Sequence, residues 1–181
     1  MKCLTKSECS DWLHQHSIVE EPYGSGKKIS GSYLQFTAPD SAQASMHLMR
    51  CLIGNHSRHE GDLECFDGIL GKFEGALLLL NDWQTYPPDM YSIVMSLRHS
   101  HEEQRSLVDA PGHLFDANED ADLIGQCNLI LMYNWTAYLY LASAKATFLF
   151  WEGELIDFWT HDMEIYQKVK SLIQELKLRL T

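Results

Sequence analysis

The chain has 181 residues, of which 45% are apolar, and a formal net charge of −11. This length and composition predict one globular domain over residues 1–181, with a sizeable core, and exclude a disordered chain. The acidic balance argues against nucleic-acid binding, which needs clustered Lys and Arg, and favours a basic protein partner. No apolar run is long enough to span a membrane, and the amino terminus has no apolar leader, so we expect a cytoplasmic protein without membrane contact.

The amino-terminal region predicts a helix followed by a strand. Thr5 and Glu8 have the spacing of a capping box, which places a helix over residues 6–16. Residues 20–31 are polar and rich in glycine, as is typical of a loop. Alternation of apolar and polar residues then predicts a strand over residues 33–37.

A second helix is expected to start at Pro39-Asp40 and to end at Gly54-Asn55. Its apolar positions recur at i, i+3, i+4, i+7 and i+8, which is the pattern of one buried helix face. His47 and Cys51 both fall on this face. We therefore expect His47 to be a core histidine and Cys51 to be a buried thiol.

The middle of the chain predicts one buried strand and one helix. Residues 75–81 form a continuous apolar run of strand length, as expected for a strand covered on both faces. A short strand is also expected at residues 63–66. Pro88 opens the next helix, which should end near Arg98, because proline is well tolerated in the first turn.

The last third predicts a helix, three strands and a closing helix. Asn118 is the expected N-cap of a helix that ends near Asn134. Glu152-Gly153 predicts a tight turn between the last two strands, since glycine permits positive φ. The expected strands cover residues 137–142, 147–151 and 154–159, and the closing helix covers residues 163–180.

Together these elements predict an α+β fold: an antiparallel sheet of about five strands with helices packed on it and a carboxyl-terminal β-β-β-α unit. Apolar side chains occur on both faces of the predicted strands. Both faces therefore need cover, by helices on one side and by a helix, a loop or a second copy of the chain on the other. A homodimer is consistent with this pattern.

The cysteines and histidines predict neither a metal site nor a cofactor. The five cysteines are scattered, and no pair has CxxC spacing, so we expect no disulfide framework and no zinc ribbon. The pairs His56/His59 and His99/His101 match no metal motif and are expected to be solvated. Residues 116–122 resemble the start of a calcium loop, but Ala121 stands where the sharp turn needs glycine.

No segment has the pattern of an activated nucleophile, so we assign no catalytic residue. His161-Asp162 is the best-placed pair for proton transfer, although Asp162 is equally suited to capping the closing helix, the role that we favour. A small hydrolase would have to combine this pair with residues near His99–Glu103. A small-ligand-binding domain that uses the tryptophan-rich strands is the other alternative.

The clearest charge feature is the segment of residues 102–122. It contains seven acidic residues and one cation, Arg105, so its net charge is −6. The simplest interpretation is a solvated acidic loop, and the functional alternative is a docking surface for a basic partner, where such charge mainly raises the association rate. The preferred function is thus a small non-enzymatic interaction protein, such as an acidic, immunity-type neutraliser of a basic protein. The expected binding residues are Glu102, Glu103, Asp109, Asp116, Glu119, Asp120 and Asp122.

Overall fold

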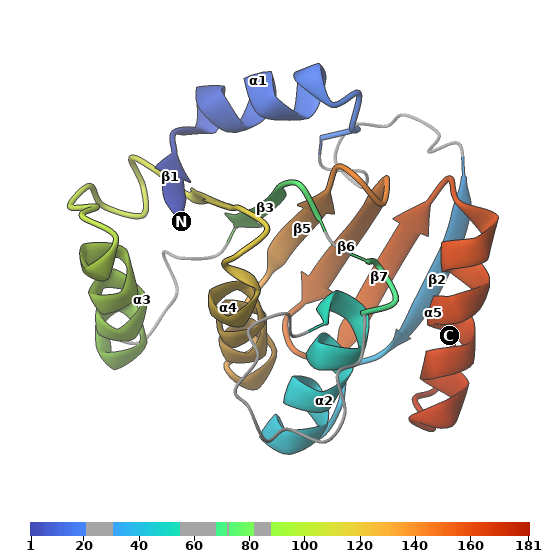
Figure 1. The fold of residues 1–181 in the computed structure, drawn as a ribbon. Helices are drawn as coiled ribbons and strands as arrows, with labels where there is room; N and C mark the ends of the chain where they lie inside the picture. The colour runs from blue at the N-terminus through green and yellow to red at the C-terminus, as the bar shows by residue number, and fades with distance from the viewer. Residues whose placement is uncertain (21–30, 55–67, 72, 82–87) are drawn as a thin grey trace.

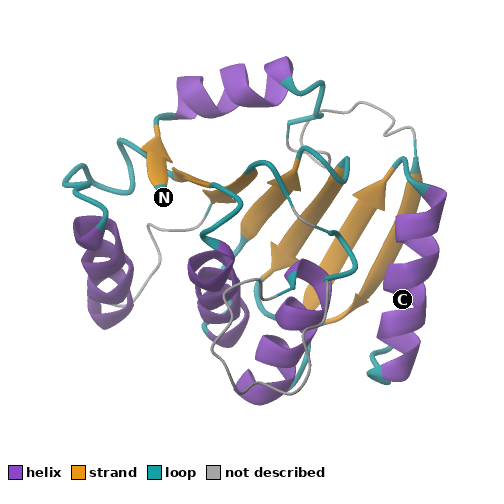
Figure 2. Ribbon diagram, viewed as in Figure 1, coloured by secondary structure: helices purple, strands orange, loops and turns teal. Residues whose placement is uncertain are grey.

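A computed structural model describes residues 1–20, 31–54, 68–71, 73–81 and 88–181 of the chain. Within these ranges it contains five helices and a seven-stranded sheet, and it ends in the predicted β-β-β-α unit (Figure 2). The α+β class is therefore confirmed. The elements are β1 (Lys2–Leu4), α1 (Lys6–Gln15), β2 (Ser32–Thr37), α2 (Ala42–Ile53), β3 (Ala76–Leu80), α3 (Pro88–Ser100), β4 (Gly112–Phe115), α4 (Asp120–Met132), β5 (Ala137–Leu141), β6 (Ala146–Trp151), β7 (Leu155–Thr160) and α5 (Met163–Glu175).

The strands lie in the order β1-β4-β3-β5-β6-β7-β2, and every neighbouring pair is antiparallel. The number of strands is seven rather than about five. The two missed strands, β1 and β4, have only three and four residues, which is too short for alternation to be recognised. They form one end of the sheet, beside α3, whereas β2 and α5 lie at the other end (Figure 1).

The two faces of the sheet bury separate sets of side chains. One cross-strand row joins Leu78, Leu139, Phe148, Phe158 and Leu34, and this face packs against α2, α4 and α5, while Val94 of α3 belongs to the same core. The opposite face carries Leu77, Leu79, Tyr138, Tyr140 and Leu149, which pack against Cys9 and Leu13 of α1. We call them the three-helix face and the α1 face. Both are covered, as the apolar pattern requires.

Local signals predicted α1 and the β6–β7 turn correctly. The Thr5 hydroxyl accepts a bond from the Glu8 amide, and the Glu8 carboxylate accepts one from the Thr5 amide, which completes the capping box. In the turn, the Glu154 amide donates to the Trp151 carbonyl at 2.9 Å. Both residues between them have positive φ, 47° at Glu152 and 68° at Gly153.

Several local predictions were wrong. Asn118 does not cap α4: the N-cap position falls on Glu119, whose side chain makes no capping bond. α5 ends at Glu175 rather than Leu180, because the following residues turn back and Leu180 forms a bridge with Phe36 of β2. His47 is exposed rather than in the core. The strand predicted at residues 63–66 lies outside the described residues.

A buried arginine organises the corner between α3 and β4. Arg98 is 0% exposed, and its guanidinium donates to the carbonyls of Ala110, Arg105 and Ser106 at 2.8–3.3 Å. It also donates to Nε2 of buried His113 at 3.0 Å. Burial and the adjacent Arg98 charge lower the pKa of His113 to about 3, so the imidazole is neutral. The Arg98 side chain thus holds the loop between α3 and β4 through the backbone carbonyls of that loop.

Candidate binding surface

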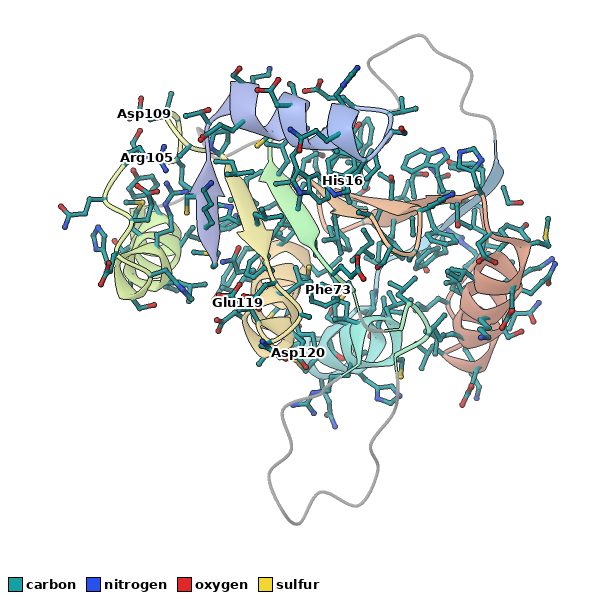
Figure 3. All side chains as sticks on the ribbon, turned by 45° about the horizontal axis from the view of Figure 1, so that its top comes forward. His16, Phe73, Arg105, Asp109, Glu119 and Asp120 are labelled. Atoms are coloured by element: carbon teal, nitrogen blue, oxygen red, sulfur yellow. The ribbon has the colours of Figure 1, made fainter. Side chains whose placement is uncertain are left out.

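The seven acidic residues of the predicted docking segment occupy three different environments. Glu102, Asp109 and Asp116 are exposed, whereas Asp120 at the start of α4 is only 1% exposed. The remaining three, Glu103, Glu119 and Asp122, are partly buried. They do not form one continuous patch, since Asp109 and Arg105 lie beside β1 and apart from Glu119 and Asp120 (Figure 3).

Glu103 is engaged by the cation of its own segment. The Arg105 guanidinium donates to both carboxylate oxygens of Glu103, at 2.9 and 2.5 Å, and also to the Cys3 carbonyl at 3.0 Å. These bonds lower the pKa of Glu103 to about 2. The Glu103–Arg105 pair fixes the loop after α3 to the edge strand β1. Glu103 therefore has a structural role and is less suited to contact another protein.

A second group of charges gathers where α3, α4 and β1 meet. The amino group of Met1 forms an ion pair with Glu119, and it lies 3.1 Å from Nδ1 of His101. Nε2 of the same imidazole lies 3.3 Å from a carboxylate oxygen of Asp122. Two of the predicted binding residues, Glu119 and Asp122, are therefore brought together, although the Met1 amino group already balances part of their charge.

Asp116 and Glu119 also border a hollow of about 630 Å³ at the amino-terminal side of the molecule. Its walls come from α1, β1, the end of β4 and the segment before β3. The side chains that give it its chemistry are Trp12, His16, Lys2, Glu74, Asp116 and Glu119. This volume lies within the range of ordinary ligand and side-chain sites.

One wall of the hollow is aromatic. The rings of Trp12 and His16 lie one helical turn apart on α1, with centroids 4.3 Å apart. Nδ1 of His16 lies 2.8 Å from the Trp12 carbonyl, which holds the imidazole against the helix. The indole lies against Gly75, where a Cβ would stand 3.6 Å from the ring. Three carboxylates, Lys2 and the amino group of Met1, which is paired with Glu119, also line the hollow, so it combines an aromatic surface with a small excess of negative charge.

A larger groove of about 740 Å³ runs between α2 and α5. His47 and Cys51 line it from α2, and Met163, Leu172 and Glu175 line it from α5. Cys51 is half-buried rather than buried as predicted, whereas Cys3, Cys9 and Cys127 are buried. Burial and the charge of Glu175 raise the pKa of the Cys51 thiol.

The residues considered for hydrolysis do not meet. Asp162 caps α5, its carboxylate accepting bonds from the amides of Glu164 and Ile165 at 2.8 and 3.1 Å. His161 follows β7 near one end of the sheet, whereas His99–Glu103 lie at the carboxyl-terminal end of α3 beyond the other end (Figure 1). This geometry disfavours a shared active site for these two groups.

The tryptophans are distributed over both faces. Trp135 is buried with the helices of the three-helix face, whereas Trp159 belongs to the α1 face. Trp159 packs against Tyr33, whose hydroxyl donates to buried Asp157 at 2.5 Å. Trp83 lies outside the described residues. The described tryptophans therefore do not line one ligand site.

The sequence patterns did not identify Trp12, His16 or Glu74 as neighbours. Trp12 and His16 have the i, i+4 spacing that places two side chains on one helix face, so their contact had a local signal. Glu74 had none, because it precedes a buried strand and reaches the hollow only through the pairing of β3 with β4.

No family model, curated protein or solved structure matches this chain. Among the described residues, no helix is long and apolar enough to cross a membrane. The same residues contain no group of three or more His, Cys, Asp or Glu side chains arranged to hold a metal ion.

Proposed function

We propose that the protein is a small non-enzymatic binding protein for a basic protein partner. An immunity-type neutraliser of a basic toxin is a concrete form of this function. The observation that carries the proposal is the hollow beside α1, in which three carboxylates and an aromatic pair line one concave surface. The net charge of −11 supports it, since such a charge accelerates encounter with a basic protein.

A guanidinium or ammonium group has the chemistry that this hollow accommodates. Cations are attracted to the face of an indole ring, by about 0.5–1 kcal/mol at exposed sites, and they form charge-assisted hydrogen bonds with carboxylates. Glu74 and Asp116 are exposed and belong to different segments, so a side chain entering the hollow meets carboxylates from two sides. Lys2 of β1 also lines the hollow, and its positive charge repels a cationic ligand from that side.

The acidic residues outside the hollow have a different role in this proposal. Glu102 and Asp109 are exposed and contribute to long-range attraction, whereas Asp120 is buried and Glu103 is bonded to Arg105. Neutralising Glu102 and Asp109 is therefore expected to reduce the association rate with little change in the dissociation rate.

The test measures binding of a short arginine-rich peptide by the change in tryptophan fluorescence, at low and at high salt. Binding should occur at low salt and weaken as salt rises. Replacing Glu74→Gln together with Asp116→Asn should weaken it by about tenfold, which corresponds to 1.4 kcal/mol. The matched control, Glu152→Gln with Glu154→Gln, removes the same charge at the exposed β6–β7 turn and should have little effect.

Equal loss in the two double variants would show that only net charge matters and that the hollow is not the site. Absence of binding to arginine-rich and lysine-rich peptides alike, in low salt, would contradict a basic partner. A protein captured from the native cell by the wild type, but not by the Glu74/Asp116 variant, would then serve to measure the same differences with the physiological ligand.

A further inference from the structure

The corner where α3, β4 and β1 meet buries a guanidinium against an imidazole. His113 of β4 is fully buried and lies opposite Cys3 of β1 and Leu78 of β3, so it extends the apolar cross-strand row of the three-helix face. Arg98 of α3 follows buried Val94 by four residues, so both point from one helix face. Nη1 of Arg98 lies 3.0 Å from Nε2 of His113.

This bond determines the charge of the imidazole. A guanidinium carries only hydrogen-bond donors, so Nε2 of His113 must offer its lone pair and carries no hydrogen. A protonated imidazole has an N–H group at both nitrogens and would place a second positive charge against Arg98. Burial and the Arg98 charge lower the pKa of His113 to about 3, against the opposing effects of the backbone at Leu78 and Pro111 and of the Glu103 carboxylate. The closed corner is therefore compatible only with a neutral imidazole.

The same guanidinium holds two segments of the chain. Its other bonds go to three carbonyls of the loop formed by residues 101–111, those of Arg105, Ser106 and Ala110. The Arg105 side chain donates in turn to the Cys3 carbonyl of β1 at 3.0 Å. Displacement of Arg98 from His113 therefore loosens the loop and, through it, the edge strand β1.

We propose that this corner is a pH-sensitive switch, in which protonation of His113 releases the loop after α3 and the strand β1 from β4 while the rest of the sheet stays folded. Opening exposes the imidazole to water, from which it takes one proton, and the imidazolium cannot return to its place beside Arg98. β4 keeps its position, because it is also paired with β3 on its other side.

Other titratable groups lie at this corner, and the experiment must separate them from His113. At the surface, the His101 imidazole contacts the Met1 amino group and the carboxylate of Asp122. On the same row as His113, burial raises the pKa of the Cys3 thiol, whereas β3 contributes only apolar side chains. The remaining charged neighbours are Glu103, Arg105 and Glu119.

Opening of the corner also alters the hollow beside α1, because Lys2 of β1 and the neighbouring Met1 line it. A basic partner bound there would dissociate more readily in acid. This consequence rests on the proposed function, whereas the switch itself does not.

The experiment uses the buried thiol of Cys3 as the reporter of the open corner. Wild-type protein is labelled with a dipyridyl disulfide, and mass spectrometry measures the rate at each cysteine relative to a short peptide that contains the same cysteine at the same pH. His113 has a pKa of about 3 in the closed corner and an ordinary value of about 6.5 in the open one, so opening becomes easier as pH falls below about 6.5. The relative rate at Cys3 should rise by about 25-fold between pH 7 and pH 5. Cys127, fully buried in the core of the three-helix face, should react at least about tenfold more slowly than Cys3 at both pH values.

Three variants identify the group that responds to pH. His113→Gln keeps an oxygen that accepts from Arg98 but does not titrate, so the Cys3 rate should stay within about threefold between the two pH values. Arg98→Met removes the contacts with the loop and should accelerate labelling of Cys3 at pH 7 already. His14→Gln removes an exposed histidine from α1 and should keep the wild-type pH dependence. Circular dichroism on each variant shows that it is folded.

Equal labelling rates at Cys3 and Cys127 would show that only global unfolding exposes Cys3, and would overturn the switch. The same pH dependence in wild type and folded His113→Gln would overturn it as well. If His113→Gln does not fold, a Cys3 rate in Arg98→Met that equals the wild-type rate at pH 7 decides against the proposal.

Binding of the arginine-rich peptide then tests the consequence for the hollow. Its affinity should fall more between pH 7 and pH 5 for wild type than for His113→Gln. An equal fall would show that the corner does not control the hollow. Failure of the peptide to bind at all contradicts the proposed function alone, since labelling of Cys3 involves no peptide.

Discussion

The two faces of the sheet are covered in different ways. The three-helix face buries a continuous set of aromatic and aliphatic side chains under α2, α4 and α5. The α1 face buries a smaller set under one ten-residue helix, and it includes tyrosines. Because α1 is short and alone, its ends leave room at the surface, and the acidic hollow forms beside it.

If the hollow is the binding site that we propose, stability and binding are placed on opposite faces of the sheet. Burial of apolar area is the main favourable contribution to folding, so the face with more covering helices contributes more of the free energy of unfolding. A single covering helix has fewer tertiary contacts and is expected to open locally at lower cost. Four predictions test this comparison, from the largest expected effect to the smallest.

Phe158 tests the three-helix face. Its ring is fully buried and packs 4.7 Å from the ring centroid of Phe148. Phe158→Ala should lower the free energy of unfolding by about 4 kcal/mol, through lost burial and a cavity that the surrounding helices cannot fill. Urea denaturation followed by circular dichroism measures this value. A loss below about 1 kcal/mol would mean that this face is not where stability resides.

Leu13 tests the α1 face. It is 1% exposed on α1, and Leu13→Ala should lower the free energy of unfolding by about 2–3 kcal/mol. The loss should be local, so amide hydrogen exchange should accelerate in α1 while β3 and β5 remain protected. His14→Ala, at an exposed neighbouring position, is the control. Uniform acceleration across the sheet would show that the two faces unfold as one unit.

His113 tests whether the three-helix side has a pH-dependent weak point. Its folded pKa of about 3 lies below the unfolded value of about 6.5, so the unfolded chain binds a proton that the folded chain does not. Stability therefore falls as pH falls below about 6.5, by about 2 kcal/mol from this group between pH 7 and pH 5.

His113→Gln removes that titration and keeps an oxygen that accepts the Arg98 bond. The urea midpoint of this variant should change less between pH 7 and pH 5 than the wild-type midpoint does. The difference between the two pH profiles isolates His113 from the carboxylates, which both proteins share. Parallel profiles would show that His113 already becomes protonated in the folded protein at pH 5.

Thr5 tests the anchoring of α1. Thr5→Ala removes the hydroxyl that accepts from the Glu8 amide and should cost about 1 kcal/mol, whereas Thr5→Ser keeps the bond and should cost less. Thermal unfolding of both variants measures the effect. If the alanine variant also weakens peptide binding in the hollow, the position of Trp12 and His16 depends on the start of this helix. Unchanged binding would show that tertiary contacts alone hold them.

Local sequence patterns were sufficient where the interactions are themselves local. The capping box of α1, the turn at Glu152-Gly153 and the Asp162 cap of α5 each involve residues within a few positions of one another. The α+β class followed from strand-length apolar runs and amphipathic helices. Even so, His47 was misplaced, because periodicity identifies a helix face without defining how far that face extends under its neighbours.

The candidate binding hollow and the edge strands of the sheet could not be predicted from local patterns, because they depend on contacts between residues distant in the sequence. β1 and β4 are strands only because each pairs with the other and β4 pairs with β3. The same pairing places Glu74 and Asp116 beside α1, whereas Asp120 is buried at the start of α4 and Asp109 lies elsewhere. Composition determines the total charge of −11, but the free energy of long-range strand pairing decides which of those charges share a surface.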